Sequence, residues 1–153
     1  MAEAQQFPDL ATKLARGVGR AFAALGCATL TEFRLANGRR ADLVCLSARG
    51  EVTIVEVKSS IEDFRADRKW PDYLAWCDNF YFAVPEGFPL EMIPTECGLI
   101  VADGFGAAIL RLSPIAALAG ARRRALILAI AVTASDRLRR LTDPEPSPIA
   151  AAL

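Results

Sequence analysis

The sequence contains no histidine, which excludes every catalytic or metal-binding arrangement that depends on imidazole. Carboxylates and lysines are then the natural candidates for any chemistry. The four cysteines lie 18, 32 and 20 residues apart without a Cys-x-x-Cys pair, a spacing that argues against a zinc site. Several of them lie in apolar, strand-like runs, which predicts reduced core thiols in a cytosolic protein.

Long hydrophobic runs and a secretory signal are also missing. The most apolar window, 125–134, is about half the length needed to cross a bilayer, and three arginines precede it. The N-terminal residues show no basic region followed by an apolar stretch. We therefore expect a cytoplasmic protein with no membrane partner, in which 153 residues form a single globular domain.

The chain has no net charge, which argues against a strongly basic nucleic-acid binder. Its charges are nevertheless unevenly distributed. Residues 1–110 hold eleven basic and fifteen acidic side chains, whereas residues 111–141 hold seven basic and one acidic. The basic segment could help to hold a polyanion, or it could be a solvated helix face.

Apolar spacing and turn residues predict an α/β fold (α+β, mixed sheet) over residues 1–141, followed by a proline-rich flexible tail at 142–153. An antiparallel meander of three strands precedes a helix and further strands, and helices flank the sheet. The expected helices are 9–25, a segment after Ser60 that Trp70-Pro71 interrupts, and 114–141, which Gly120 could break. The expected strands are 29–35, 40–46, 52–58, 79–84, 99–102 and 107–112.

Asp42, Glu56 and Lys58 form the candidate site. Side chains alternate across a strand, so Glu56 and Lys58 share one face. A turn centred on Arg49 places Asp42 opposite Glu56, with Cβ atoms roughly 5 Å apart. Two such carboxylates repel unless a cation or a proton lies between them, and Mg²⁺ suits oxygen ligands of this kind. Lys58 could then orient or deprotonate a water, or offset phosphate charge.

The alternative interpretation of this triplet is an exposed sheet face on which Lys58 simply neutralises Glu56. The segment after it also has two interpretations. Ser59 or Ser60 caps the helix, and nearby cations (Arg65, Arg68 and Lys69) are close enough to balance the like charges of Asp63 and Asp67. Lys69 could contact phosphate, and Trp70 and Tyr73 could stack on unpaired bases or belong to the core.

The spacing Asp42…Glu56-Val57-Lys58 resembles the PD-(D/E)xK signature of restriction-endonuclease-like nucleases. The flanking sequence resembles the MmcB-like family of bacterial DNA-repair-associated proteins over residues 9 to about 112. Four stretches carry this resemblance: 31–34, 38–42, 55–60 and 63–73.

The resemblance implies a restriction-endonuclease-like core and a Mg²⁺- or Mn²⁺-dependent nuclease that acts on damaged, branched or single-stranded DNA. Asp42 and Glu56 would hold the metal and, with Lys58, form the catalytic set. Ala41 replaces the motif's proline, a position that varies in the superfamily. A non-catalytic DNA-binding or adaptor module is the alternative, and superfamily habit makes a homodimer plausible.

A third acidic ligand would come from Glu32, because the first helix offers only Asp9. A two-residue Asn37-Gly38 loop would pair Phe33 with Asp42 and turn Glu32 to the opposite face, whereas a bulge or a three-residue loop would bring Glu32 round. The predicted nucleic-acid-binding residues are Arg39, Arg40, Arg65 and Lys69; for the first two, simple strand solvation is an equal alternative.

Overall fold

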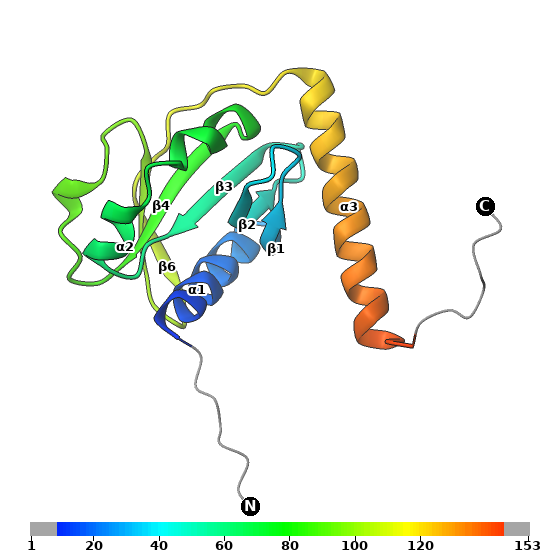
Figure 1. Cartoon of the computed structure of the whole chain (residues 1–153), viewed down its shortest axis with the longest axis horizontal. Coiled ribbons are helices and arrows are strands. Elements are labelled where there is room, and N and C mark those ends of the chain that lie inside the picture. The colour runs from blue at the N-terminus through cyan, green and yellow to red at the C-terminus, as the bar shows by residue number, and fades with distance from the viewer. Residues whose placement is uncertain (1–8, 146–153) are drawn as a thin grey trace, which may run out of the picture.

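The computed structural model describes residues 9–145, and within them a six-stranded mixed sheet is flanked by helices (Figure 1). The strands follow one another across the sheet in chain order, and the first three form the predicted antiparallel meander. The α/β prediction is therefore confirmed. The strands are β1 (Ala28–Arg34), β2 (Arg40–Leu46), β3 (Val52–Val57), β4 (Asn79–Pro85), β5 (Gly98–Ala102) and β6 (Ala107–Arg111).

The sheet becomes parallel where helical segments connect its strands. Helix α2 (Ile61–Ala66) and the 3-10 helix η1 (Trp70–Trp76) carry the chain from β3 to the parallel strand β4. A second connection, which contains η2 (Leu90–Met92), leads to β5. The helix predicted after Lys58 ends at Ala66, earlier than expected, and a proline near the start of η1 begins the new turn.

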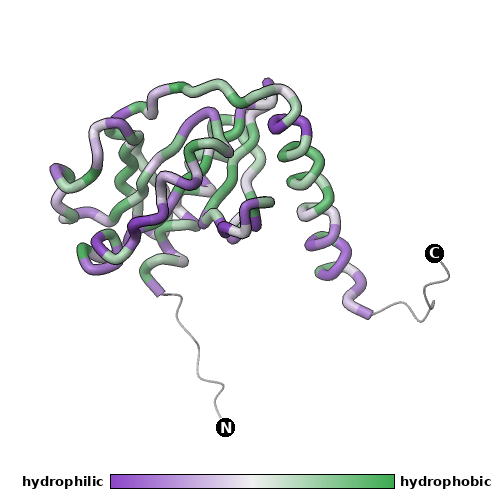
Figure 2. Tube along the Cα trace, turned by 45° about the horizontal axis from the view of Figure 1, so that its top comes forward, coloured by the Kyte–Doolittle hydropathy of each residue, from purple (hydrophilic) through white to green (hydrophobic). Residues whose placement is uncertain are grey.

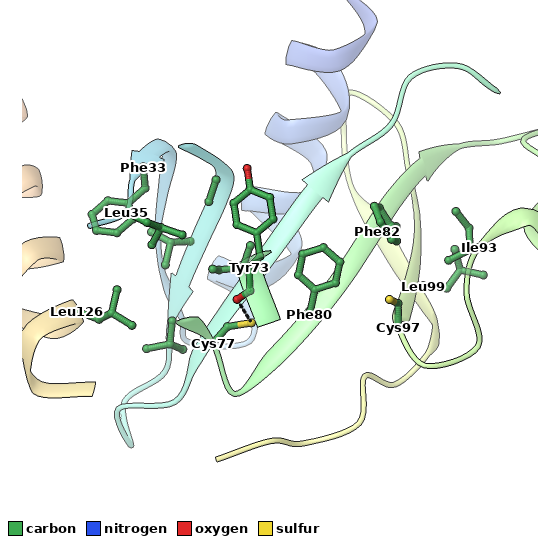
Figure 3. Packing of buried hydrophobic residues seen from close by; sticks show 14 of the residues in the cluster. Phe33, Leu35, Tyr73, Cys77, Phe80, Phe82, Ile93, Cys97, Leu99 and Leu126 are labelled. Atoms are coloured by element: carbon green, nitrogen blue, oxygen red, sulfur yellow. Dashed lines mark hydrogen bonds between the residues drawn. The ribbon is translucent and has the colours of Figure 1, made fainter. Parts of the chain in front are cut away.

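Two apolar layers enclose the sheet. On one face, α1 (Leu10–Ala24) buries Leu14, Val18 and Phe22. On the other face, Tyr73 of η1 stacks on Phe80 of β4, in the cluster drawn in Figure 3. Figure 2 shows hydrophobic colouring in the strands between these layers and more hydrophilic colouring toward the C-terminal end of the last helix.

Close packing of α1 depends on Gly17. A Cβ at this position would clash with the carbonyl oxygens of Asp103 and Gly106, in the turn between β5 and β6. We expect Gly17→Ala to lower the free energy of unfolding by about 1–3 kcal/mol, because backbone must move to admit the methyl group. Gly19→Ala is the matched control: its Cβ would lie 3.7 Å from Thr29 Oγ1, so a helix-favouring alanine fits there. Urea unfolding measures both, and equal losses would contradict this account.

The hairpin between β1 and β2 decides between the two loop lengths that the sequence left open. Phe33 pairs with Ala41, not with Asp42, so the loop at Asn37-Gly38 holds three residues between Leu35 and Arg39. The reason is burial: Phe33, Leu35 and Ala41 all belong to the apolar cluster, and a one-residue slip would turn Phe33 to the face of Asp42. Helix packing thus outweighs the two-residue preference of Asn-Gly.

The last helix, α3 (Gly120–Thr142), begins six residues later than the predicted Pro114. The preceding segment binds Asp78 instead of forming a helical turn: the Ala116 N–H donates to the Asp78 carbonyl and the Leu118 N–H to its carboxylate. The predicted tail at 142–153 lies mostly outside the described residues, and Thr142 is helical.

Hydrogen bonds to Asp78 connect α3 to the sheet. The nearly fully buried carboxylate of Asp78 accepts hydrogen bonds from the Val52 N–H at 2.8 Å, the Leu118 N–H at 2.9 Å and the Arg123 guanidinium at 2.6 and 2.7 Å. Although burial opposes ionisation, these donors lower the pKa of Asp78 to about 2. Further along α3, Leu126 and Ile130 are buried. Within residues 9–145, no helix combines the length and apolarity that a bilayer crossing requires.

Candidate functional site

A cleft of about 790 Å³ opens between α1 and the adjoining ends of β1, β2 and β3, where α2 also begins. Within residues 9–145, its walls carry five carboxylates and two cationic side chains, so the cleft is strongly acidic. An acidic cleft repels a nucleic-acid phosphate unless cations enter with it. The charged lining residues are Asp9, Glu32, Asp42, Glu56, Asp63, Arg16 and Lys58.

Asp42 and Glu56 lie together in this cleft, as the predicted register requires. Val44 pairs with Ile54, and the same register continued along the strands brings Asp42 opposite Glu56. Each carboxylate accepts a hydrogen bond from the backbone of the other strand. Glu56 Oε1 accepts from the Asp42 N–H at 3.0 Å, and Asp42 Oδ2 accepts from the Val57 N–H at 2.8 Å. The two side chains are thereby fixed in orientation, and the second oxygen of each makes no hydrogen bond among the described residues.

The electrostatics of this pair favour a bound proton or cation. Burial raises the pKa of Glu56 to about 8, and the neighbouring Asp42 carboxylate adds to the shift. Burial also raises the pKa of Asp42, although the Val57 N–H opposes this. Near neutral pH, ionising both carboxylates without a bound proton or cation is therefore energetically unfavourable.

Lys58 forms its ion pair with Asp67 and not with Glu56, although its charge opposes the rise in the pKa of Glu56 and of Asp42. It lies one residue beyond β3, with its side chain only 7% exposed, and its Nζ donates to Asp67 Oδ2 at 2.7 Å. Asp67 Oδ1 in turn accepts from the Lys69 N–H at 2.8 Å, which fixes the carboxylate at the end of α2. Burial opposes ionisation of Asp67, but the hydrogen bonds from Lys58 and Lys69 lower its pKa. The ammonium is thus held beside the acidic pair by a separate anion.

This ion pair corrects the expected charge balance of α2. Lys58, and not the cations at Arg65, Arg68 and Lys69, pairs with Asp67. Asp63 takes part in the N-terminal cap of α2. Its N–H donates to Ser60 Oγ, and its carboxylate accepts from the Ser59 N–H. The predicted serine cap is therefore present.

Glu32 reaches the rim of the cleft. The three-residue loop aligns it opposite Asp42, and its φ of 48° is unusual for a residue with a side chain. Its side chain is 71% exposed, with Oε1 3.9 Å from Arg40 Nη2. Among residues 9–145, no group of three acidic or thiol side chains is close enough together to hold a metal ion. A third carboxylate ligand from Glu32 stays a prediction.

The donors that are present fit a hard divalent cation. Mg²⁺ commonly takes one or two carboxylates and completes its shell with water and phosphate. Asp42 and Glu56 offer two fixed carboxylates with a free oxygen each, in a cleft whose excess of acid favours a cation. Mg²⁺ or Mn²⁺ at this pair therefore stays consistent with the site.

The four basic residues predicted to bind nucleic acid lie outside the cleft lining. Arg39 is engaged with Asp72, its Nη2 2.9 Å from Asp72 Oδ2, and Arg40 is the exposed neighbour of Glu32. Arg65 and Lys69 are exposed, and neither forms an ion pair within the part of the chain that the structure describes. Phosphate contact by these side chains is an untested prediction.

The aromatic residues after α2 belong to the core. Trp70 stacks on Phe80 with ring centroids 5.8 Å apart, and Tyr73 is buried while its hydroxyl donates to the Arg40 carbonyl. Of the two interpretations of Trp70 and Tyr73, the packing supports the structural one.

Sequence reasoning missed the ion-pair partner of Lys58 and one charged residue that lines the cleft. Asp67 is the partner of Lys58, and the pairing of these residues, nine apart in sequence, depends on α2 ending at Ala66, which no pattern in the sequence specifies. Arg16 lines the cleft from α1 and donates through Nε to the Gly104 carbonyl at 2.9 Å. No local pattern marks Arg16, because its partner lies 88 residues away.

Comparison with known proteins supports the resemblance. The family described as DNA repair protein MmcB-like matches residues 2–145. The solved structure of a protein of unknown function from Silicibacter pomeroyi is 44% identical, with a TM-score of 0.90; the match covers 94% of this chain and 99% of that one. No curated protein matches significantly. Because the family match spans nearly the whole sequence, the chain belongs to the MmcB-like family of DNA repair proteins.

Proposed function

We propose that this protein hydrolyses DNA phosphodiester bonds with Mg²⁺ or Mn²⁺ in a repair pathway, on damaged, branched or single-stranded DNA. The observation that carries the proposal is the Asp42–Glu56 pair, which two backbone N–H groups orient inside an acidic cleft. The family name supports the link to DNA repair. A divalent ion at such a pair supplies charge neutralisation at the phosphate and an activated water.

The residues around the pair have separable roles. Asp42 and Glu56 would hold the cation, and the backbone N–H of Val57 keeps the Asp42 carboxylate in place. Lys58, held in position by its ion pair with Asp67, would offset negative charge on the phosphate. Because Lys58 and Arg16 are the only cationic side chains among residues 9–145 that line the cleft, the entry of DNA would be favoured by a bound cation.

A metal-dependent nuclease screen tests this proposal. Wild type should cleave at least one substrate among four-way junctions, flaps, abasic duplexes and single strands in Mg²⁺ or Mn²⁺, and none in EDTA. Asp42→Asn should reduce cleavage on the order of 100-fold or more, because it removes a charged ligand. Asp136→Asn, on the exposed face of α3, is the matched control and should cleave as wild type does.

A DNA-binding module without catalysis is the second candidate. It is favoured by the exposed position of Glu32 and by the engagement of Lys58 with Asp67. In that case wild type binds DNA with a steep salt dependence but cleaves nothing in either metal. Absence of DNA binding at low salt would overturn both candidates.

A further inference from the structure

One edge of the sheet is covered by a helix, whereas the other edge is open. At the β1 edge, Arg137 of α3 donates to the Thr31 carbonyl at 2.6 Å and to the Glu32 carbonyl at 2.9 Å, so a helix covers the edge. At the other edge, β6 pairs only with β5, and no side chain among the described residues hydrogen-bonds to the main chain of Ala107–Arg111. An open edge strand is a template for pairing with another strand.

Large apolar side chains follow this open edge. Ile109 and Leu110 of β6 are 39% and 53% exposed, and alternation places them on opposite faces of the strand. Leu112 is 74% exposed just beyond its end, and Phe105 is 78% exposed just before its start. A soluble protein rarely leaves so many apolar side chains in sequence on one edge unless they form a contact.

The edge also lacks a protecting charge. Arg111 is the only charged residue of β6, and its guanidinium turns back into the molecule, where it donates to the Pro94 carbonyl at 2.8 Å and the Cys97 carbonyl at 2.9 Å. Charged side chains are the usual means of preventing edge-to-edge pairing. No charged side chain of β6 itself therefore opposes the approach of a second, identical edge.

An apolar hollow of about 350 Å³ continues the edge toward α1. It lies between the C-terminal half of α1 and strands β5 and β6, and all of its lining residues are apolar. Leu25, at its margin, is 67% exposed. The lining residues are Ala21, Phe22, Ala24, Leu25, Ile100, Ala107 and Ile109.

We propose that β6 pairs antiparallel with β6 of a second copy of this chain, which joins the two sheets about a two-fold axis. The unpaired main-chain donors and acceptors of an edge strand can pair with another strand. The same chain supplies an uncharged apolar strand, and an isologous contact covers both edges at once. Leu110 then faces the partner strand's apolar side chains, and the hollow beside Leu25 is closed. This inference does not rest on the proposed cleavage.

Sedimentation equilibrium of the full-length protein, from about 5 to 500 µM, tests the proposal. Wild type should be a dimer. Leu110→Lys should raise the dimer dissociation constant at least about 30-fold, because the two-fold axis brings two added charges together. Leu128→Lys, on a comparably exposed position of α3 (57%), is the matched control and should leave the dimer intact. Circular dichroism verifies that each variant is folded.

Leu112→Lys provides a second variant at the same edge and should also weaken the dimer. A wild-type protein that is monomeric up to 500 µM overturns the proposal, and the edge must then serve a different protein. A dimer that Leu128→Lys dissociates and Leu110→Lys does not overturns it as well, because α3 would be the contact. Loss of nuclease activity in any variant has no bearing on this result.

Discussion

Asp67→Asn is expected to lower the free energy of unfolding by about 3 kcal/mol, because it leaves the buried Lys58 ammonium without its anionic partner. The side chains of Lys58 and Asp67 are only 7% and 18% exposed, so water replaces little of the lost interaction. The same variant should weaken Mn²⁺ binding about tenfold, since a released ammonium can turn to Glu56 and occupy the place of the cation. Urea unfolding and calorimetric titration with Mn²⁺ measure the two effects.

A double substitution separates charge from packing. Lys58→Met removes the ammonium, so Asp67→Asn combined with Lys58→Met should recover most of the lost stability and the Mn²⁺ affinity. Asp72→Asn, which breaks the more exposed pair with Arg39, is the matched control and should cost less than about 1 kcal/mol. If Asp67→Asn lowers stability and Lys58→Met restores none of it, Asp67 acts through α2 and not through Lys58.

A second large effect is expected from pH. Burial and Asp42 raise the pKa of Glu56 from 4.5 to about 8, so the folded protein retains a proton that the unfolded chain releases. In EDTA the free energy of unfolding should therefore fall as pH rises from about 5 to about 8, by on the order of 2 kcal/mol. Glu56→Gln should flatten this slope and be more stable than wild type at pH 8. Thermal unfolding across this pH range measures the slope.

Mn²⁺ should reverse the same slope in wild type. A cation at the pair replaces the proton, and saturation at 100 times its dissociation constant stabilises the fold by about 2.7 kcal/mol. Glu56→Gln should lose most of this gain, whereas Glu91→Gln, on an exposed 3-10 helix, should keep both the slope and the metal response. An unchanged pH slope in Glu56→Gln would show that the proton is bound elsewhere.

The central geometry was predictable because its causes are local. The turn at Arg49-Gly50 and the alternation of apolar residues set the register of Val44 on Ile54, and Asp42 then meets Glu56. The serine cap before α2 followed from the residues at its own start. These features need no knowledge of the rest of the chain.

Other features depend on contacts between distant segments. The register of the first hairpin follows the burial of Phe33 and Leu35 against the helical layer, which outweighs the preference of Asn37-Gly38. The start of α3 at Gly120 depends on Asp78, 40 residues before the Leu118 N–H that it binds. The pairing of Lys58 with Asp67 requires α2 to end at Ala66, which no pattern in the sequence specifies.

The carboxylate of Asp78 also affects the local unfolding of α3. Its donors, Val52, Leu118 and Arg123, are 26, 40 and 45 residues away in sequence. Separating α3 from the sheet would leave a buried anion without its cation, so the first turns of α3 and the start of β3 form one cooperative unit. We therefore expect amide hydrogens there to exchange only when the sheet itself opens, and those beyond Arg137 to exchange by local fraying.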